Sequence, residues 1–449
     1  MSSRTTNIPV AVPAGAPAGR PGAPGAPGVA GTQPRTIAGS LPGARGVANR
    51  LLHGTPGRMR LYGLIGVIAA LLLGAISANA LIASQAAVER AANNTAQVVR
   101  AQSIHVNLLR ADALATNAFL VGGVESSDSR TKYEQAMASV AASLAEGAAA
   151  QPADADALGL LSQQVQTYVG LVEQARANNR LNLPIGAQYL TQASDGLRAD
   201  AIPTVEAIVS ANEDRANKEF DRSNSSWQLL VGLVSLIALV LIAVWLAKRT
   251  HRYLNLSLSS AIVILVISLF VAASTIGAIG AATRNVQQGD FSTAVQLADV
   301  TTAANDARAN ESLTLIKRGS GAAYESKWKT DDTAVRTALQ DVPNGTSLLS
   351  QWDAYRAVHT KVRSLDDNGQ WDQAVRLSTS TATDGAASTF AAFDEAASAQ
   401  RDAASHRAVD ALQGQGGSAP FFAAAIAIAA LVASWLVVRG FGQRIEEYR

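Results

Sequence analysis

The chain has 449 residues, no cysteine, 37 basic and 35 acidic residues, and 48% hydrophobic side chains. These figures exclude a small disulfide-stapled protein, a cysteine-based zinc ribbon and a wholly disordered chain. Only 16% of the residues are charged, against roughly a quarter in an ordinary soluble domain. The missing charge is concentrated in four long uncharged blocks, so the composition indicates a membrane protein.

The N-terminal tail, residues 1–57, is rich in Pro, Gly and Ala and holds nine of the fourteen prolines. This composition buries no core, and we expect the tail to be disordered. Residues 1–60 contain seven Arg and no acidic residue. The tail could touch anionic lipid or a cytoplasmic partner, or it could serve only as a spacer.

Four apolar stretches are predicted to be transmembrane helices. They are residues 58–83, 227–247, 256–279 and 419–438. Each has about 20 residues or more, which spans the roughly 30 Å hydrocarbon layer. Ala78-Asn79-Ala80 has the form of a signal-peptide cleavage site, so a cleaved signal peptide is the alternative to the first span. The length of the apolar run and of the tail before it favours the span, and either outcome leaves the first acidic segment outside.

The connections between these stretches differ in charge. Basic residues dominate the tail, the short hairpin 248–255 and the C-terminal residues 439–449. The positive-inside rule places all three in the cytoplasm, with both termini. The two large segments, residues 84–226 and 280–418, carry more acidic than basic residues, and we expect them outside the plasma membrane.

Each large segment is predicted to form a four-helix bundle, because Ala, Leu, Gln and Glu recur at helical spacing between turn residues. In the first segment we expect helices over 84–121, 129–147, 154–178 and 185–226. In the second we expect them over 284–318, 322–341, 346–365 and 370–413. Turn residues such as Pro343-Asn344-Gly345 separate the stretches.

The two segments also share short matches in the same order, which indicates a tandem duplication. The matches are Asp112-Ala113 with Asp306-Ala307, Tyr133-Glu134 with Tyr324-Glu325, residues 160–163 with 348–351 (both LLSQ), and Asp195-Gly196 with Asp384-Gly385. The predicted fold is therefore an all-α integral membrane protein with four transmembrane helices, two tandem extracytoplasmic four-helix bundles and a disordered N-terminal tail.

Helix continuity across the membrane boundary suggests how a signal could travel. Residues 204–248 contain one Gly and no Pro, and residues 281–309 contain only Gly289 as a weak point. Gly414, Gly416, Gly417 and Pro420 interrupt the last connection. We expect rigid helices to couple the bundles to the basic hairpin through the second and third spans, with Lys248, Arg249 and Arg252 as the cytoplasmic relay.

Two stretches of the first segment carry a family resemblance. They are residues 110–120 (RADALATNAFL) and 183–194 (LPIGAQYLTQAS), the second followed by Arg198 and Ile202-Pro203. The arrangement resembles the four-helix-bundle sensor domains of bacterial chemoreceptors. Over residues 58–449 it more closely resembles the actinobacterial GlnX-type membrane proteins.

The resemblance implies a sensor in amino-acid nutrient control. Its partners would be an extracytoplasmic aspartate- and glutamate-binding lipoprotein and a cytoplasmic serine/threonine kinase or adaptor, besides membrane lipid. Chemoreceptor-like bundles often pair as homodimers, whereas the duplication could supply an internal pseudo-dimer instead. The alternatives are a passive envelope scaffold and a transporter or transporter accessory subunit.

Asp112 falls on the apolar stripe of its helix, with Leu108 and Phe119. A carboxylate there must be paired or partly solvated, as a structural contact or as a ligand or partner contact. Arg198 could bind a carboxylate in a fork or solvate a helix face. The full set of candidate contacts is Asp112, Thr116, Asn117, Tyr189, Arg198, Asp306 and Asn310.

The sequence contains no pattern typical of an enzyme. The five His residues are scattered, without a second ligand three or four positions away. Phosphate-binding loops and nucleophile motifs are absent from the sequence. We therefore expect no catalytic residues, no metal, no cofactor and no nucleic-acid partner. The spans carry no ionisable residue between their ends, and their small residues, such as Gly74 and Gly277, are interpreted as helix contacts.

Overall fold

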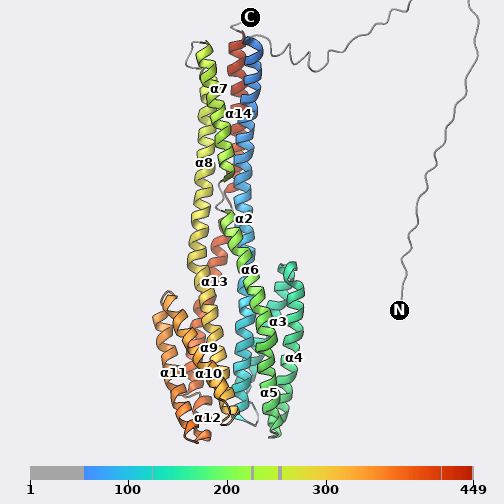
Figure 1. Ribbon diagram of the computed structural model, residues 1–449, viewed down its shortest axis with the longest axis vertical. Coiled ribbons are helices and arrows are strands. Elements are labelled where there is room, and N and C mark those ends of the chain that lie inside the picture. The colour runs from blue at the N-terminus through green and yellow to red at the C-terminus, as the bar shows by residue number, and fades with distance from the viewer. Residues whose placement is uncertain (1–54, 124, 224–226, 251–254, 416, 447–449) are drawn as a thin grey trace, which may run out of the picture. The chain divides into compact units, whose positions relative to one another are not determined.

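The computed structural model describes residues 55–123, 125–223, 227–250, 255–415 and 417–446. Within these ranges the chain is helical with short turns and contains no strand (Figure 1), so the predicted all-α class is confirmed. The predicted disordered tail falls in residues 1–54, outside the described ranges. Its last three residues were assigned wrongly, because the first described helix begins at Thr55. Pro56 fits a first helical turn, where no backbone N–H is needed.

The helices in chain order are α2 (Thr55–Val121), α3 (Ser127–Ala150), α4 (Ala155–Arg180), α5 (Ile185–Gly196), α6 (Ile202–Ser223), α7 (Trp227–Thr250), α8 (Leu256–Val286), α9 (Ser292–Ile316), α10 (Ala322–Asp341), α11 (Gly345–Asp367), α12 (Trp371–Thr379), α13 (Ala386–Gln413) and α14 (Ala419–Glu446). A short 3-10 turn, η1 (Pro152–Asp154), precedes α4. Two π-helical turns, η2 (Leu197–Ala201) and η3 (Gln287–Phe291), join α5 to α6 and α8 to α9.

Four helices of the described chain are long and apolar enough to cross a membrane. These are the N-terminal part of α2, then α7, α8 and α14, as the hydropathy predicts. Gly74 of α2 approaches α14 so closely that an added Cβ would clash with Ala430. Small residues of this kind let membrane helices pack closely. Gly277 has no neighbour within 4 Å of such a Cβ, so its interpretation as a helix contact was wrong.

The first span continues directly into the segment that follows it. Helix α2 runs for 67 residues from Thr55 to Val121, with no Pro after its first turn to interrupt the backbone ladder. The third span is likewise helical from Leu256 to Ile316, through η3. The predicted rod over residues 204–248 crosses residues 224–226, which lie outside the described ranges. The helix is interrupted between Gln413 and Ala419, near the glycines of that connection.

Each segment between spans has its own hydrophobic core. In the first, the core is built from α2, α3, α4, α5 and α6, around side chains such as Leu108, Leu161 and Tyr168. In the second, it is built from α9 to α13, around Trp352 and Phe393. We call these the first bundle, residues 84–223, and the second bundle, residues 280–415. In Figure 1 the C-terminal part of α2 and helix α9 lie side by side along the bundles.

Two further predictions about helix bounds were wrong. A single helix was expected over residues 370–413, but α12 ends at Thr379 and α13 begins at Ala386. The hydroxyl of Ser380 accepts a hydrogen bond from the backbone N–H of Ala382 at 3.2 Å, which replaces the helical bond pattern. The C-terminal tail, predicted from residue 439, is helical to Glu446, because Phe441 is buried among the spans.

Candidate functional site

Arg198 joins the two bundles through two carboxylates. Its side chain leaves the π-helical turn η2 and donates to Asp112 on α2, with Nη1 to Oδ2 at 2.8 Å. It also donates to Asp306 on α9, with Nε to Oδ1 at 2.8 Å, and a second contact is made through Nη2. Asp112 is 0% exposed and Arg198 only 13%, so Arg198 does not solvate an open helix face.

The carboxylate of Asp112 is fully paired inside the first bundle. It accepts hydrogen bonds from the hydroxyls of Ser194 at 2.6 Å and Tyr168 at 3.4 Å. These add to the hydrogen bond from the guanidinium of Arg198. Burial opposes the charge of Arg198, but the two aspartates outweigh it and raise the pKa of the guanidinium above its ordinary value. Burial, and then the charge of Asp112, raise the pKa of Tyr168. Arg198 is therefore a permanent cation between two anions.

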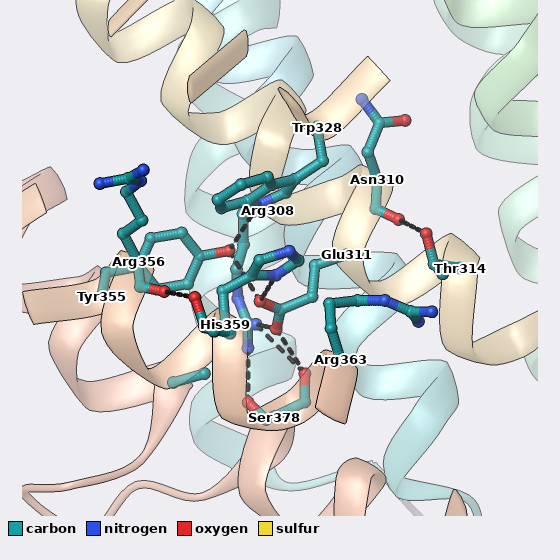
Figure 2. Close-up of polar contacts among 12 residues, drawn as sticks. Arg308, Asn310, Glu311, Thr314, Trp328, Tyr355, Arg356, His359, Arg363 and Ser378 are labelled. Carbon is teal, nitrogen blue, oxygen red and sulfur yellow. Dashed lines mark hydrogen bonds and ion pairs between the residues drawn. The ribbon is translucent and has the colours of Figure 1, made fainter. Parts of the chain in front are cut away.

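A second polar cluster lies inside the second bundle, around Glu311 of α9 (Figure 2). The Glu311 carboxylate accepts from Ser378 of α12 at 2.7 Å and from Tyr355 of α11 at 3.0 Å. It forms an ion pair with Arg308 one turn earlier on α9. The Nδ1 atom of His359 lies 2.7 Å from Glu311 Oε2. Three helices of the bundle, α9, α11 and α12, therefore converge on one carboxylate.

His359 is held between two carboxylates. Its Nε2 atom lies 3.4 Å from Oε2 of Glu325 on α10, and Trp328 stacks on its ring with the centroids 3.5 Å apart. Burial disfavours a charged imidazole, but Glu311 and Glu325 raise the pKa of His359 above its ordinary value. Burial likewise opposes the charge of Glu311, yet Arg308 and His359 lower the pKa of Glu311 to about 2. The cluster is a buried network of opposite charges.

Two more arginines cross between the bundles. Arg308 donates to the side-chain oxygen of Asn117 on α2 at 2.8 Å, which connects the Glu311 cluster to the first bundle. Arg110 of α2 donates to Asp394 of α13 at 3.0 Å, and Asn305 of α9 donates to the same carboxylate at 2.9 Å. Three arginines thus hold α2 against the second bundle.

The other predicted contacts have local partners. The Thr116 hydroxyl donates to the carbonyl of Asp112 at 2.9 Å, within its own helix. Tyr189 packs against the core of the first bundle. Asn310 donates to Asp331 of α10 at 3.0 Å, while its own side-chain oxygen is buried without a partner. Burial, and then the charge of Asp306, raise the pKa of Asp331 to about 7.

Two of the predicted relay residues lie at the C-terminal end of α7, beyond the second span. Lys248 and Arg249 are exposed in the last turn of α7, whereas Arg252 lies outside the described residues. The side chain of Asn255 accepts from the N–H of Leu258 at 3.4 Å and donates to the carbonyl of Gly440 at 2.9 Å. The start of α8 is therefore tied to the end of α14.

Several residues of the site were not predicted. Among them are Arg110, Arg308, Glu311, His359 and Asp394. Glu311 falls four residues after Ala307 and four before Leu315, both of them buried, so the stripe argument applied to Asp112 would have found it. His359 was passed over because no metal-ligand spacing surrounds it, although its partners are carboxylates on other helices. Among the described residues no group of side chains is placed to hold a metal ion.

Comparison with known families bears on the first bundle. Residues 87–221 match the family model described as an actinobacterial sensor domain. The match begins in α2 and ends in α6, so it contains Asp112 and Arg198 but none of the second bundle. No curated protein and no solved structure matches the chain. The match supports a sensing role, in a multi-pass helical membrane protein.

Proposed function

We propose that this protein is a transmembrane sensor that receives an extracytoplasmic amino-acid signal at its first bundle and relays it to a cytoplasmic kinase pathway. The observation that carries the proposal is the course of α2. The sensor-family match starts within this helix, which extends unbroken from the first candidate span. A rigid helix of this kind transmits a small slide or rotation along its axis.

The input surface is proposed to be the end of the first bundle farthest along α2 from its span. Large apolar side chains exposed outside the spans are few, and within the described residues all lie in the first bundle: Val121, Leu160, Leu181, Leu183 and Ile185. All except Leu160 belong to the end of α2 or to the α4–α5 connection. These two ends are joined because Asn179 donates to the carbonyl of Phe119 at 3.1 Å. We call Val121, Leu181, Leu183 and Ile185 the apolar tip.

The occupant of the apolar tip is proposed to be an extracytoplasmic solute-binding protein carrying aspartate or glutamate. An exposed apolar patch favours contact with a protein more than contact with a small polar solute. A direct aspartate ligand would need free cationic groups, but Arg198 and Arg110 are already paired with carboxylates of the chain. An amino acid presented by a separate protein avoids this requirement.

The output is proposed to pass through the basic end of α7. Lys248 and Arg249 are exposed there, and the link from Asn255 to Gly440 joins the neighbouring helix start to α14. Motion of any span would therefore reach the same end of the membrane domain. A cytoplasmic serine/threonine kinase or adaptor would read this surface, because the described chain there consists of helix ends alone.

Crosslinking in intact membranes tests the input. The double variant Leu181→Ser/Leu183→Ser removes two side chains of the apolar tip. The matched control is Leu160→Ser, because Leu160 is 51% exposed and lies elsewhere on the first bundle. With aspartate or glutamate supplied, the wild type and the control should crosslink to a solute-binding protein, and the double variant should not. Equal crosslinking of the double variant, or crosslinking to no solute-binding protein, would reject the proposed input.

A separate insertion tests the relay. Gly-Gly-Gly inserted after Ala83 breaks α2 between the first span and the first bundle, and the same insertion after Gly122, in the turn that follows α2, is the control. We expect the first insertion to retain the solute-binding partner but abolish the amino-acid-dependent phosphorylation of cytoplasmic proteins. A normal phosphorylation response with α2 interrupted would show that the helix is not the relay.

A further inference from the structure

A third polar site, separate from those around Arg198 and Glu311, lies where α2, α6 and α9 meet. A cavity of about 180 Å³ opens there, between the two bundles. Helix α2 contributes Gln102 and His105, α6 contributes Glu206 and Glu213, and α9 contributes Asp299. Since a water molecule occupies about 30 Å³ of liquid, the cavity has room for a small organic molecule.

No Lys or Arg of the described residues lines this cavity beside its carboxylates. Within the described part of the chain, no Lys or Arg forms an ion pair with Glu206, Glu213 or Asp299. Asp299 lies at the open rim, yet desolvation of its carboxylate and the charge of Glu206 raise its pKa to about 6. Burial, with Asp299 and Asp214 nearby, also raises the pKa of Glu213. These anions differ from Asp112 and Glu311, each of which has an arginine.

The floor of the cavity carries two polar side chains without partners. Gln102 is 6% exposed, and its Nε2 atom makes no hydrogen bond. The Nε2 atom of His105 is also buried without a partner. Burial lowers the pKa of His105 to about 4, against the opposing charge of Asp306, so its ring is neutral at pH 7. A buried polar atom left unpaired costs stability. An ammonium group can donate a hydrogen bond to Nε2 of the neutral His105 ring, whereas the Gln102 amide N–H, itself a donor, gains no partner from an ammonium.

We propose that this cavity binds a small aliphatic diamine, with its ammonium groups on the carboxylates of α6 and α9. Glu206 and Glu213 are seven residues apart on one face of α6, which separates them by about 10 Å along the helix. Val209 and Val295 line the wall between the charged groups. This alternation of anions and apolar surface fits ammonium groups joined by a short alkyl chain.

A bare metal ion fits the site less well. The described residues contain no group of His, Asp and Glu side chains placed to ligate one. An apolar wall adds nothing to the binding of a hard cation, which prefers oxygen ligands on every side. An alkylammonium gains from both the wall and the carboxylates. Because the cavity joins α9 to α2 and α6, such a ligand would bridge the two bundles.

Calorimetric titration of the full chain in neutral-lipid nanodiscs at pH 8 tests the proposal. The probes are 1,5-diaminopentane and its uncharged analogue 1,5-pentanediol. We expect the diamine to bind and the diol not to bind. Absence of diamine binding up to about 10 mM, which corresponds to a barely favourable free energy, would overturn the proposal, as would equal binding of the diol. Tighter binding of Nα-acetyl-lysine amide, whose ε-ammonium is free, than of the diamine would assign the cavity to a protein lysine and also overturn the proposal.

Variants locate the binding. Glu206→Gln/Asp299→Asn removes two carboxylates of the cavity, both on exposed residues, so the fold should persist and thermal unfolding will verify it. We expect diamine affinity to fall about tenfold, because each surface ion pair contributes a modest amount. Asp156→Asn/Glu395→Gln makes the same change of charge at exposed residues outside the cavity and should retain wild-type affinity. Equal loss in both double variants would show only non-specific attraction.

Discussion

At the scale of single residues, buried charge between the bundles is compensated by charge from distant parts of the chain. Asp112 is paired by Arg198, 86 positions later, and Arg110 by Asp394, 284 positions later. The apolar stripe predicts that Asp112 needs a partner, but spacing along one helix says nothing about contacts over such separations. The partner of Asp112 therefore had to come from the structure, as did the partners of Glu311.

Replacing Arg198 should destabilise the protein strongly. Arg198→Met leaves Asp112 buried without a cation, and we expect a loss of about 3 kcal/mol in the free energy of unfolding. Arg130→Met breaks an exposed pair with Glu134 and should cost less than about 1 kcal/mol. Denaturant unfolding in nanodiscs measures both. The second change Asp112→Leu should recover part of the loss, and equal effects of the two arginine variants would contradict the assigned role.

His359 should make stability depend on pH in one window. Its pKa is raised in the fold, so its contribution is complete below about pH 6.5, its unfolded pKa. The contribution is lost as pH rises through the folded value. The difference in Tm between the wild type and His359→Gln should therefore be largest near pH 5.5 and shrink toward pH 9. The control is His406→Gln, because His406 is exposed. A Tm difference between the wild type and His359→Gln that stays constant with pH would rule out a protonated His359 in the fold.

At the scale of elements, turn chemistry predicts most helix ends. Asn344, in the predicted Pro343-Asn344-Gly345 turn, has φ of 61° and precedes α11. The break after Thr379 was missed because residues 380–385 contain a single Gly and no Pro, although Ser, Thr and Asp there compete for backbone hydrogen bonds. The π-helical turns η2 and η3 leave the helical pattern of apolar residues nearly unchanged, so periodicity could not reveal them.

Close packing of α2 on α14 gives a prediction at this scale. An added Cβ at Gly74 would clash with Ala430, so Gly74→Leu should overpack the spans and cost about 1–3 kcal/mol. Gly277→Leu, in α8, adds the same side chain where no atom lies within 4 Å, and it should be nearly neutral. Thermal unfolding in nanodiscs compares the two. A similar Tm for both variants would mean that α2 and α14 are not in close contact.

At the scale of the whole molecule, α2 connects every part that the proposed relay needs. It forms the first span, contributes to the core of the first bundle and contacts α9 and α13 of the second. Arg308 and Arg110 fix it there through Asn117 and Asp394. The sequence predicted the strongest coupling through the second and third spans, because continuity was judged from Gly and Pro alone. Contact between the bundles depends on tertiary packing, and on that basis we propose that the first span takes part in the relay as well.

The relay also requires both bundles on one side of the membrane and both termini on the other, an arrangement proposed from charge alone. The chain has no cysteine, so single cysteines report topology without background. Gln163→Cys and Ser350→Cys, exposed on the two bundles, should react with a membrane-impermeant maleimide in intact cells, because the Lys- and Arg-rich connections stay inside and leave both bundles outside. Gln443→Cys, exposed near the end of α14, should react only after permeabilisation. Protection of either bundle cysteine in intact cells would invert the topology and leave the apolar tip out of reach of an extracytoplasmic partner.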